Sequence, residues 1–81
     1  MNIEFNISAF KHNITEDKIR YALNRPQYEG PLEEDKNKYI VLGFDIAGNL
    51  LEIFYNHVDD ETINVFHAMK CRSIFYPLMD I

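Results

Sequence analysis

The chain has 81 residues, of which 47% are hydrophobic and 26% charged, and its formal net charge at pH 7 is −5. A chain of this length is expected to form one domain, residues 1–81, without a large enclosed active site, because small domains bury only about 60% of the unfolded surface. The acidic balance argues against a protein that blankets nucleic acid with cations. No apolar run approaches the roughly 20 residues of a membrane helix, and residues 1–4 lack an export signal. We therefore expect a cytoplasmic protein without membrane contact.

The first third of the chain predicts a strand and then a helix. Residues 2–7 alternate between apolar and polar side chains, which is typical of a half-buried strand. Thr15 is a suitable N-cap, and the two acids after it favour the start of a helix. Pro26 should end this helix, because the residue before a proline is pushed out of helical geometry. Residues 27–37 contain Gly30 and Pro31 without periodicity, so they predict an exposed acidic connection.

The second half predicts a meander of three strands. Apolar residues alternate over 39–45, 50–56 and 63–69, and turns are expected at 47–49 and 59–61. Ile63, Val65, His67 and Met69 should share one face of the last strand. Residues 74–79 are expected to form a short closing segment. The predicted fold class is α+β, with an antiparallel sheet of three to four strands packed by one main helix.

Candidate chemistry gathers near the C-terminus. His67 lies in the last predicted strand, and Lys70, Arg72 and Tyr76 follow it, while His12 precedes the helix. Histidine can exchange a proton with an RNA 2′-hydroxyl or a leaving oxygen, and lysine and arginine can stabilise charge on a phosphate. These five residues are our candidate catalytic set. The competing interpretation is that His67 is a hydrogen-bonded core residue and that the cations only solvate a strand edge.

The sequence favours neither a metal nor a cofactor. His57 and two nearby acids lie around one predicted turn, but their spacing is not that of a zinc site. Cys71 is the single cysteine, so it has no partner for an internal disulfide or a thiolate metal set. Its apolar neighbours indicate a structural thiol. No phosphate-binding glycine loop or dinucleotide fingerprint is present, so we expect no bound cofactor.

Four segments in order resemble the BrnT-type toxins of the RelE-like superfamily. They are KHNIT at 11–15, YIVLG at 39–43, GNLLEI at 48–53 and INVFHA at 63–68, and the resemblance spans residues 11–76. Members of that family show a Lys-His-Gly start before the helix, a G-x-L-L-x-V hairpin and a strand ending in Ile-x-Ala-Arg before a basic tail with a tyrosine. The positions that match the family's Lys-His pair, alanine, basic tail and tyrosine are Lys11, His12, Ala68, Lys70, Arg72 and Tyr76.

The chain also departs from the family pattern. Asn13 replaces the glycine, His67 replaces a small polar residue, Met69 stands where an arginine is expected, and the tail is less basic. The resemblance implies a metal-independent ribonuclease that inhibits translation, neutralised by an antitoxin with a ribbon-helix-helix domain. The alternative is a non-enzymatic interaction module or homodimer that has lost catalysis and binds through a sheet edge and the acidic loop at 29–35.

Overall fold

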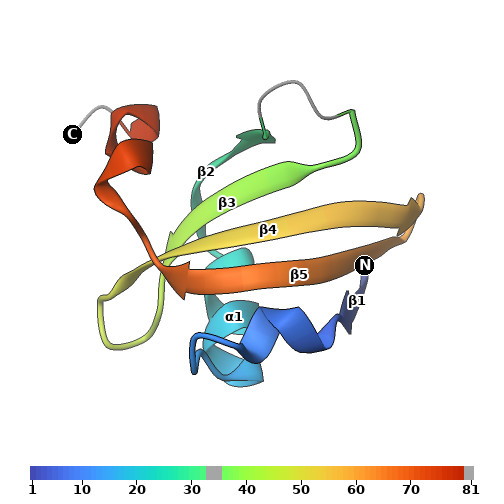
Figure 1. Ribbon diagram of the computed structural model, residues 1–81, viewed down its shortest axis with the longest axis horizontal. Coiled ribbons are helices and arrows are strands. Elements are labelled where there is room, and N and C mark those ends of the chain that lie inside the picture. Colours follow the sequence, from blue (N-terminus) through green and yellow to red (C-terminus); the bar gives the residue numbers. More distant parts are fainter. Residues whose placement is uncertain (33–35, 80–81) are drawn as a thin grey trace.

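The computed structural model describes residues 1–32 and 36–79 (Figure 1). Its core is a five-stranded sheet with the strand order β1-β5-β4-β3-β2. One α-helix and two short 3-10 helices, η1 and η2, complete the described part of the chain. The elements in chain order are β1 (Asn2–Phe5), η1 (Ile7–Phe10), α1 (Glu16–Leu23), β2 (Pro26–Pro31), β3 (Tyr39–Phe44), β4 (Leu50–Asp59), β5 (Thr62–Lys70) and η2 (Ser73–Met79).

The α+β class and the three-strand meander are confirmed, but the expected strand number and the all-antiparallel pairing are wrong. β3, β4 and β5 form the antiparallel meander. β1 adds to its far side in parallel to β5, with Asn2 opposite Thr62 and Phe5 opposite Val65. The alternating pattern of residues 2–7 predicted the strand but could not reveal its direction, because parallel and antiparallel edges show the same period.

β2 is the strand that the sequence did not predict. It pairs antiparallel to β3 at the other edge of the sheet and occupies part of the segment expected to be an exposed connection. Pro26 and Pro31 stand at its two ends, and prolines are tolerated at strand ends and on edge strands. Backbone pairing with β3 therefore forms this strand without apolar alternation. Residues 33–35 of the predicted connection lie outside the described residues.

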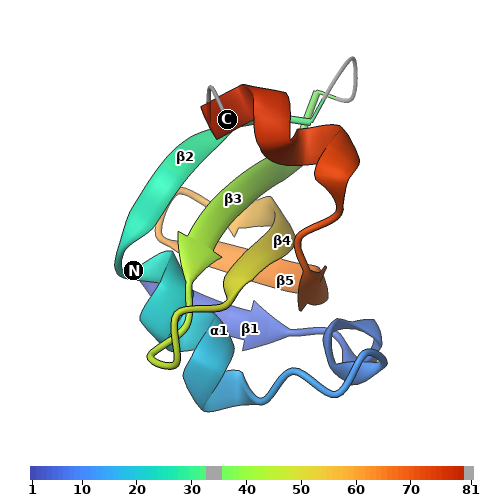
Figure 2. The same cartoon turned by 90° about the vertical axis from the view of Figure 1, so that its left-hand side faces the viewer.

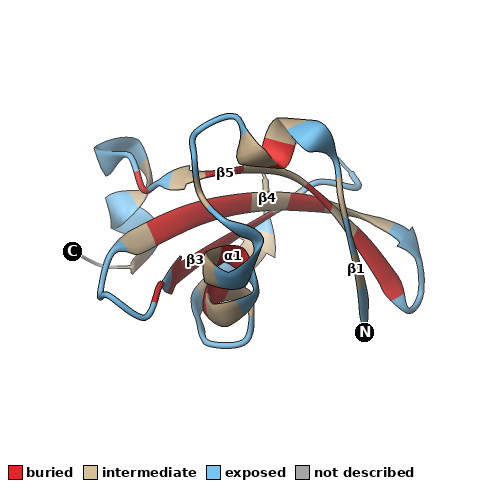
Figure 3. Cartoon of the chain, turned by 90° about the horizontal axis from the view of Figure 1, so that it is seen from below, coloured by how far each residue is buried: buried red, intermediate tan, exposed pale blue. Residues whose placement is uncertain are grey.

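The sheet separates two apolar clusters. On one face α1 and η1 cover the larger cluster, which includes the fully buried Ile19, Ile53 and Val65. On the other face η2 covers a smaller cluster around Ile40, Leu42 and Cys71. Figure 2 shows α1 and η2 on opposite sides of the sheet, and Figure 3 shows the buried stretches of the strands above α1. The C-terminal closing segment is thus confirmed, and each face of the meander has a cover.

α1 begins directly after the expected N-cap, Thr15, and ends at Leu23, before Pro26. The Thr15 side chain accepts a hydrogen bond from the Lys18 backbone N–H at 3.4 Å, as an N-cap does. The helix packs closely on β3 at Gly43, where an added Cβ atom would lie 2.6 Å from the backbone oxygen of Ala22. Glycine is required there because the backbone of a helix cannot move aside as a side chain can. None of the helices in residues 1–32 and 36–79 is long and apolar enough to cross a membrane.

Candidate active site

A bulge in β5 decides where His67 lies. Phe54 of β4 is opposite His67, but the next residue, Tyr55, is opposite Val65, so Phe66 is an extra residue in β5. Val65 therefore packs in the cluster under α1, whereas His67 lies on the η2 face. The expectation that His67 shares a face with Val65 is wrong, because the bulge breaks the two-residue alternation on which it depended.

Glu52 is the centre of the site. Its side chain is fully buried, and His67 Nε2 lies 2.9 Å from its Oε2. Arg72 binds the same carboxylate with Nη2 at 2.6 Å from Oε2 and with its backbone N–H at 2.8 Å from Oε1. Every buried side-chain nitrogen and oxygen among the described residues has a hydrogen-bond partner. The Glu52 carboxylate on β4 thus connects the His67 ring on β5 to the guanidinium group of Arg72, which follows β5 in the chain.

These contacts keep the carboxylate ionised. Burial alone would raise the pKa of Glu52, but the hydrogen bonds from Arg72 and His67 outweigh it and hold the pKa below its ordinary value. The side-chain hydrogen bond to Glu52 raises the pKa of Arg72. Glu52 therefore presents a fixed negative charge to the one nitrogen of His67 that it contacts.

Aromatic rings hold His67 from the side. The His67 ring stacks on Phe54 with centroids 4.2 Å apart, and Phe75 of η2 contacts Phe54 edge-on at 5.9 Å. The guanidinium group of Arg72 lies 5.5 Å from the centroid of the Phe75 ring. The His67 side chain keeps 20% of its surface exposed and that of Arg72 keeps 47%, so both can be reached from solvent.

His12 joins this group from the other end of the chain. Its ring meets the His67 ring edge-on, with centroids 5.5 Å apart. η1 is tied to the bulge because the Ser8 hydroxyl donates a hydrogen bond of 2.6 Å to the backbone oxygen of Phe66. Asn13 has a φ of 64°, the left-handed conformation that favours glycine and asparagine. Asn13 therefore makes the turn that a glycine would make after His12.

Lys70 and Tyr76 lie apart from this cluster. Lys70 is exposed and pairs in register with Leu51, which packs in the α1 cluster, so it stands on the opposite face of the sheet from Glu52. Tyr76 lies on η2 and is 38% exposed. Within the described chain, no hydrogen bond or ring contact links it to either histidine. The structure thus brings together three of the five candidates: His12, His67 and Arg72.

Glu52 was missed in the sequence because it stands in an otherwise apolar stretch between Leu51 and Ile53. An acid at an inward position of a buried strand is the signal that could have identified it, since buried carboxylates need partners. Its partners were not evident, because the bulge at Phe66 sets which residue of β5 faces it.

The residues considered for metal and thiol chemistry are also placed by the structure. Among residues 1–32 and 36–79 no group of three or more His, Cys, Asp or Glu side chains is arranged to hold a metal ion. Cys71 is buried, and this burial raises the pKa of its thiol, with the Glu52 charge acting in the same direction. The thiol therefore belongs to the apolar cluster under η2 rather than to a nucleophilic site.

Comparisons with protein-family models, with curated proteins and with solved structures give no match. The geometry of the site therefore carries the functional argument alone.

Proposed function

We propose that this protein is the toxin-like component of a bacterial toxin-antitoxin pair and acts in the cytoplasm as a metal-independent ribonuclease that inhibits translation. The observation that carries the proposal is the meeting of His12 and His67, from opposite ends of the chain, beside the guanidinium group of Arg72. Two imidazoles and a cation are sufficient for acid–base cleavage of RNA without a metal.

The two histidines suit different roles. His12 is exposed and can accept the proton of an RNA 2′-hydroxyl while that oxygen attacks the adjacent phosphorus. His67 is held in place by its contact with the Glu52 carboxylate and is the candidate proton donor to the departing 5′-oxygen. The exposed side of the Arg72 guanidinium group can hold the phosphate. The bond from phosphorus to the 5′-oxygen breaks, leaving a 2′,3′-cyclic phosphate and a 5′-hydroxyl.

The test is cleavage of cellular RNA by the purified protein in the presence of a metal chelator. We expect His12→Gln and His67→Gln each to lower the cleavage rate by about 10²-fold or more, as the loss of an acid or base does. His57→Gln is the matched control, because the third histidine contacts Tyr39 and Tyr55 instead of the candidate site. Intact RNA with the unsubstituted protein, or equal loss in all three variants, would overturn the assignment.

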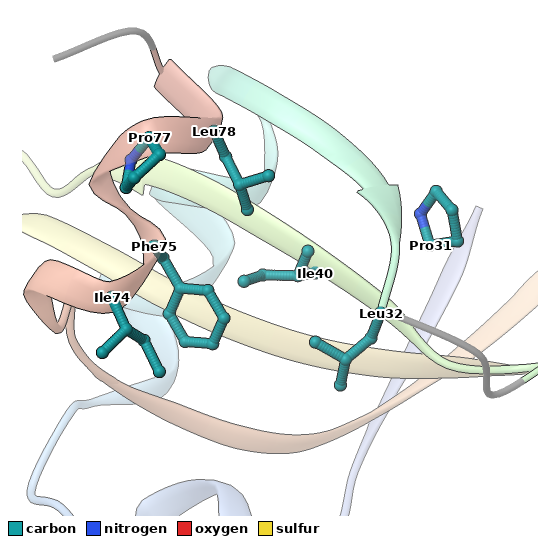
Figure 4. A pocket seen from close by; sticks show the side chains of 7 residues that line it. All are labelled: Pro31, Leu32, Ile40, Ile74, Phe75, Pro77 and Leu78. Atoms are coloured by element: carbon teal, nitrogen blue, oxygen red, sulfur yellow. The ribbon is translucent and has the colours of Figure 1, made fainter.

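A second candidate function is supported by an apolar surface. η2, β2 and β3 enclose a groove of about 360 Å³ lined by Pro31, Leu32, Ile40, Ile74, Phe75, Pro77 and Leu78 (Figure 4). Ile74 is 69% exposed and Leu78 39%. An exposed apolar patch of this kind favours contact with another protein. The partner would be an antitoxin with a ribbon-helix-helix domain or, in a purely non-enzymatic module, a second copy of the chain.

Two measurements separate the candidates. Overexpression without a partner should slow bacterial growth if the protein is a toxin, and replacing His12 and His67 together, which leaves the ion pair between Glu52 and Arg72 in place, should relieve the effect while the protein stays folded. An interaction module should leave growth unchanged and keep its binding after the double replacement. Of the predicted acidic loop at 29–35, residues 33–35 lie outside the described residues, so the groove is the surface on which the second candidate rests.

A further inference from the structure

A separate pocket lies on the α1 side of the sheet, at the opposite face from Glu52. It encloses about 270 Å³ between β1, the end of α1 and the strands. Aliphatic side chains form much of its wall, and three polar groups are added to them. The pocket is lined by Met1, Ile3, Leu23, Asn24, Glu29, Tyr55 and Ile63.

Tyr55 is a fixed polar group in this pocket. It is only 6% exposed, and its hydroxyl donates a hydrogen bond to the Glu29 carboxylate. Tyr39 stacks on its ring at 5.2 Å, and His57 contacts it edge-on at 5.7 Å. Burial and the neighbouring Glu29 charge raise the pKa of Tyr55, so the hydroxyl keeps its proton and remains a donor.

The side chains of the pocket carry charge of one sign only, and the α-amino group of Met1 belongs to a residue that also lines the pocket. Glu29 is the only charged side chain among the described residues that line it. One of its oxygens accepts the Tyr55 hydroxyl, which aims the carboxylate without neutralising it. The Asn24 side chain, which also lines the pocket, offers a further acceptor oxygen together with a donor nitrogen. A ligand that pairs with the Glu29 carboxylate therefore supplies hydrogen-bond donors and positive charge at one end and apolar surface for Ile3, Leu23 and Ile63 at the other.

We propose that this pocket binds a primary alkylammonium group, with the ammonium on Glu29 and Asn24 and the methylenes against the aliphatic wall. Each buried methylene adds about 0.8 kcal/mol of favourable transfer energy, and an ammonium matches a carboxylate at hydrogen-bond distance. Such a group occurs in free aliphatic amines and in the lysine side chains of proteins. The proposal does not depend on ribonuclease activity.

The test is titration of the full chain with n-pentylammonium, followed by amide chemical shifts in NMR. We expect shifts confined to the pocket residues and binding that is about fivefold to tenfold weaker in Glu29→Gln. Glu4→Gln is the matched control, because it removes the same charge from an exposed position of β1 that does not line the pocket. Tyr55→Phe keeps the ring but releases Glu29, so it should also weaken binding while leaving the fold intact.

Neutral 1-pentanol provides the decisive comparison. Equal affinity for the alcohol and the ammonium, unchanged binding in Glu29→Gln, or shifts that map elsewhere would overturn the proposal. A lysine with acetylated and amidated ends distinguishes the two sources: tighter binding than n-pentylammonium indicates a lysine side chain of a protein, and weaker binding indicates a free amine.

Discussion

At the residue scale, Glu52 links stability to pH. Its folded pKa lies below the ordinary value of 4.5, so the charged form stabilises the fold above that value. This contribution should be lost as the pH falls through the lowered pKa, when the carboxylate takes up a proton and Arg72 and His67 lose their anionic partner. The buried acid thus stabilises the fold at neutral pH and weakens it in acid.

We expect Glu52→Gln to lower the free energy of unfolding by about 2 kcal/mol at pH 7, since a buried carboxylate is lost but the half-exposed Arg72 is still solvated. Denaturant unfolding of both proteins between pH 3 and pH 7 checks this. The difference between the two curves should shrink on acidification. Glu61→Gln, at an exposed turn residue, is the control. A difference that stays constant with pH would contradict the role given to the charge.

At the element scale, η2 is both a cover and a support. Phe75 packs on Phe54 beneath the Arg72 guanidinium group and also closes the cluster that contains Cys71. Much of the rest of η2 faces solvent, with Ile74, Tyr76 and Leu78 all exposed. One aromatic side chain therefore joins the C-terminal helix to the sheet and to the candidate site.

Phe75→Ala should loosen this helix. Truncating a half-buried phenylalanine costs up to about 3 kcal/mol, so the helix should open more often and the Cys71 thiol should react faster with a thiol reagent, by about tenfold or more. Labelling kinetics under native conditions measure the effect. Tyr76→Ala is the control, because it truncates the neighbouring aromatic side chain, which is exposed. It should leave the rate of thiol labelling nearly unchanged. Equal rates in both variants would show that η2 does not protect the thiol.

Much of the element pattern could be predicted from the sequence, and the failures have physical causes. The meander and α1 follow from apolar periodicity and capping residues, which are local signals. β2 lacks such a signal, because its pairing depends on backbone hydrogen bonds to β3. His12, His67 and Arg72 were identified by residue type. Their convergence depends on the parallel pairing of β1 and on the bulge at Phe66, and the alternation of apolar and polar residues in the sequence indicates neither of these features.

At the scale of the whole molecule, β1 ties the first residues to the last strand. The backbone N–H groups of Asn2 and Asn6 donate hydrogen bonds to the backbone oxygens of Glu61 and Val65. Every second N–H group of a strand points to the same neighbour, so the N–H group of Glu4 also points toward β5. We expect Glu4→Pro to remove this donor and cost on the order of 2–3 kcal/mol. It should also lower RNA cleavage, because η1 and His12 lose their anchor. Glu4→Ala is the control, and unfolding and cleavage assays measure both effects.

The pairing of β1 with β5 has a consequence for synthesis. On the ribosome the segment with His12 emerges early, yet its neighbours His67 and Arg72 belong to the last strand and the residues just after it. A nascent chain therefore cannot assemble the candidate site until β5 and the residues just after it have left the ribosome. Any cleavage of RNA by this chain would therefore begin only after β5 has been made and folded against β1.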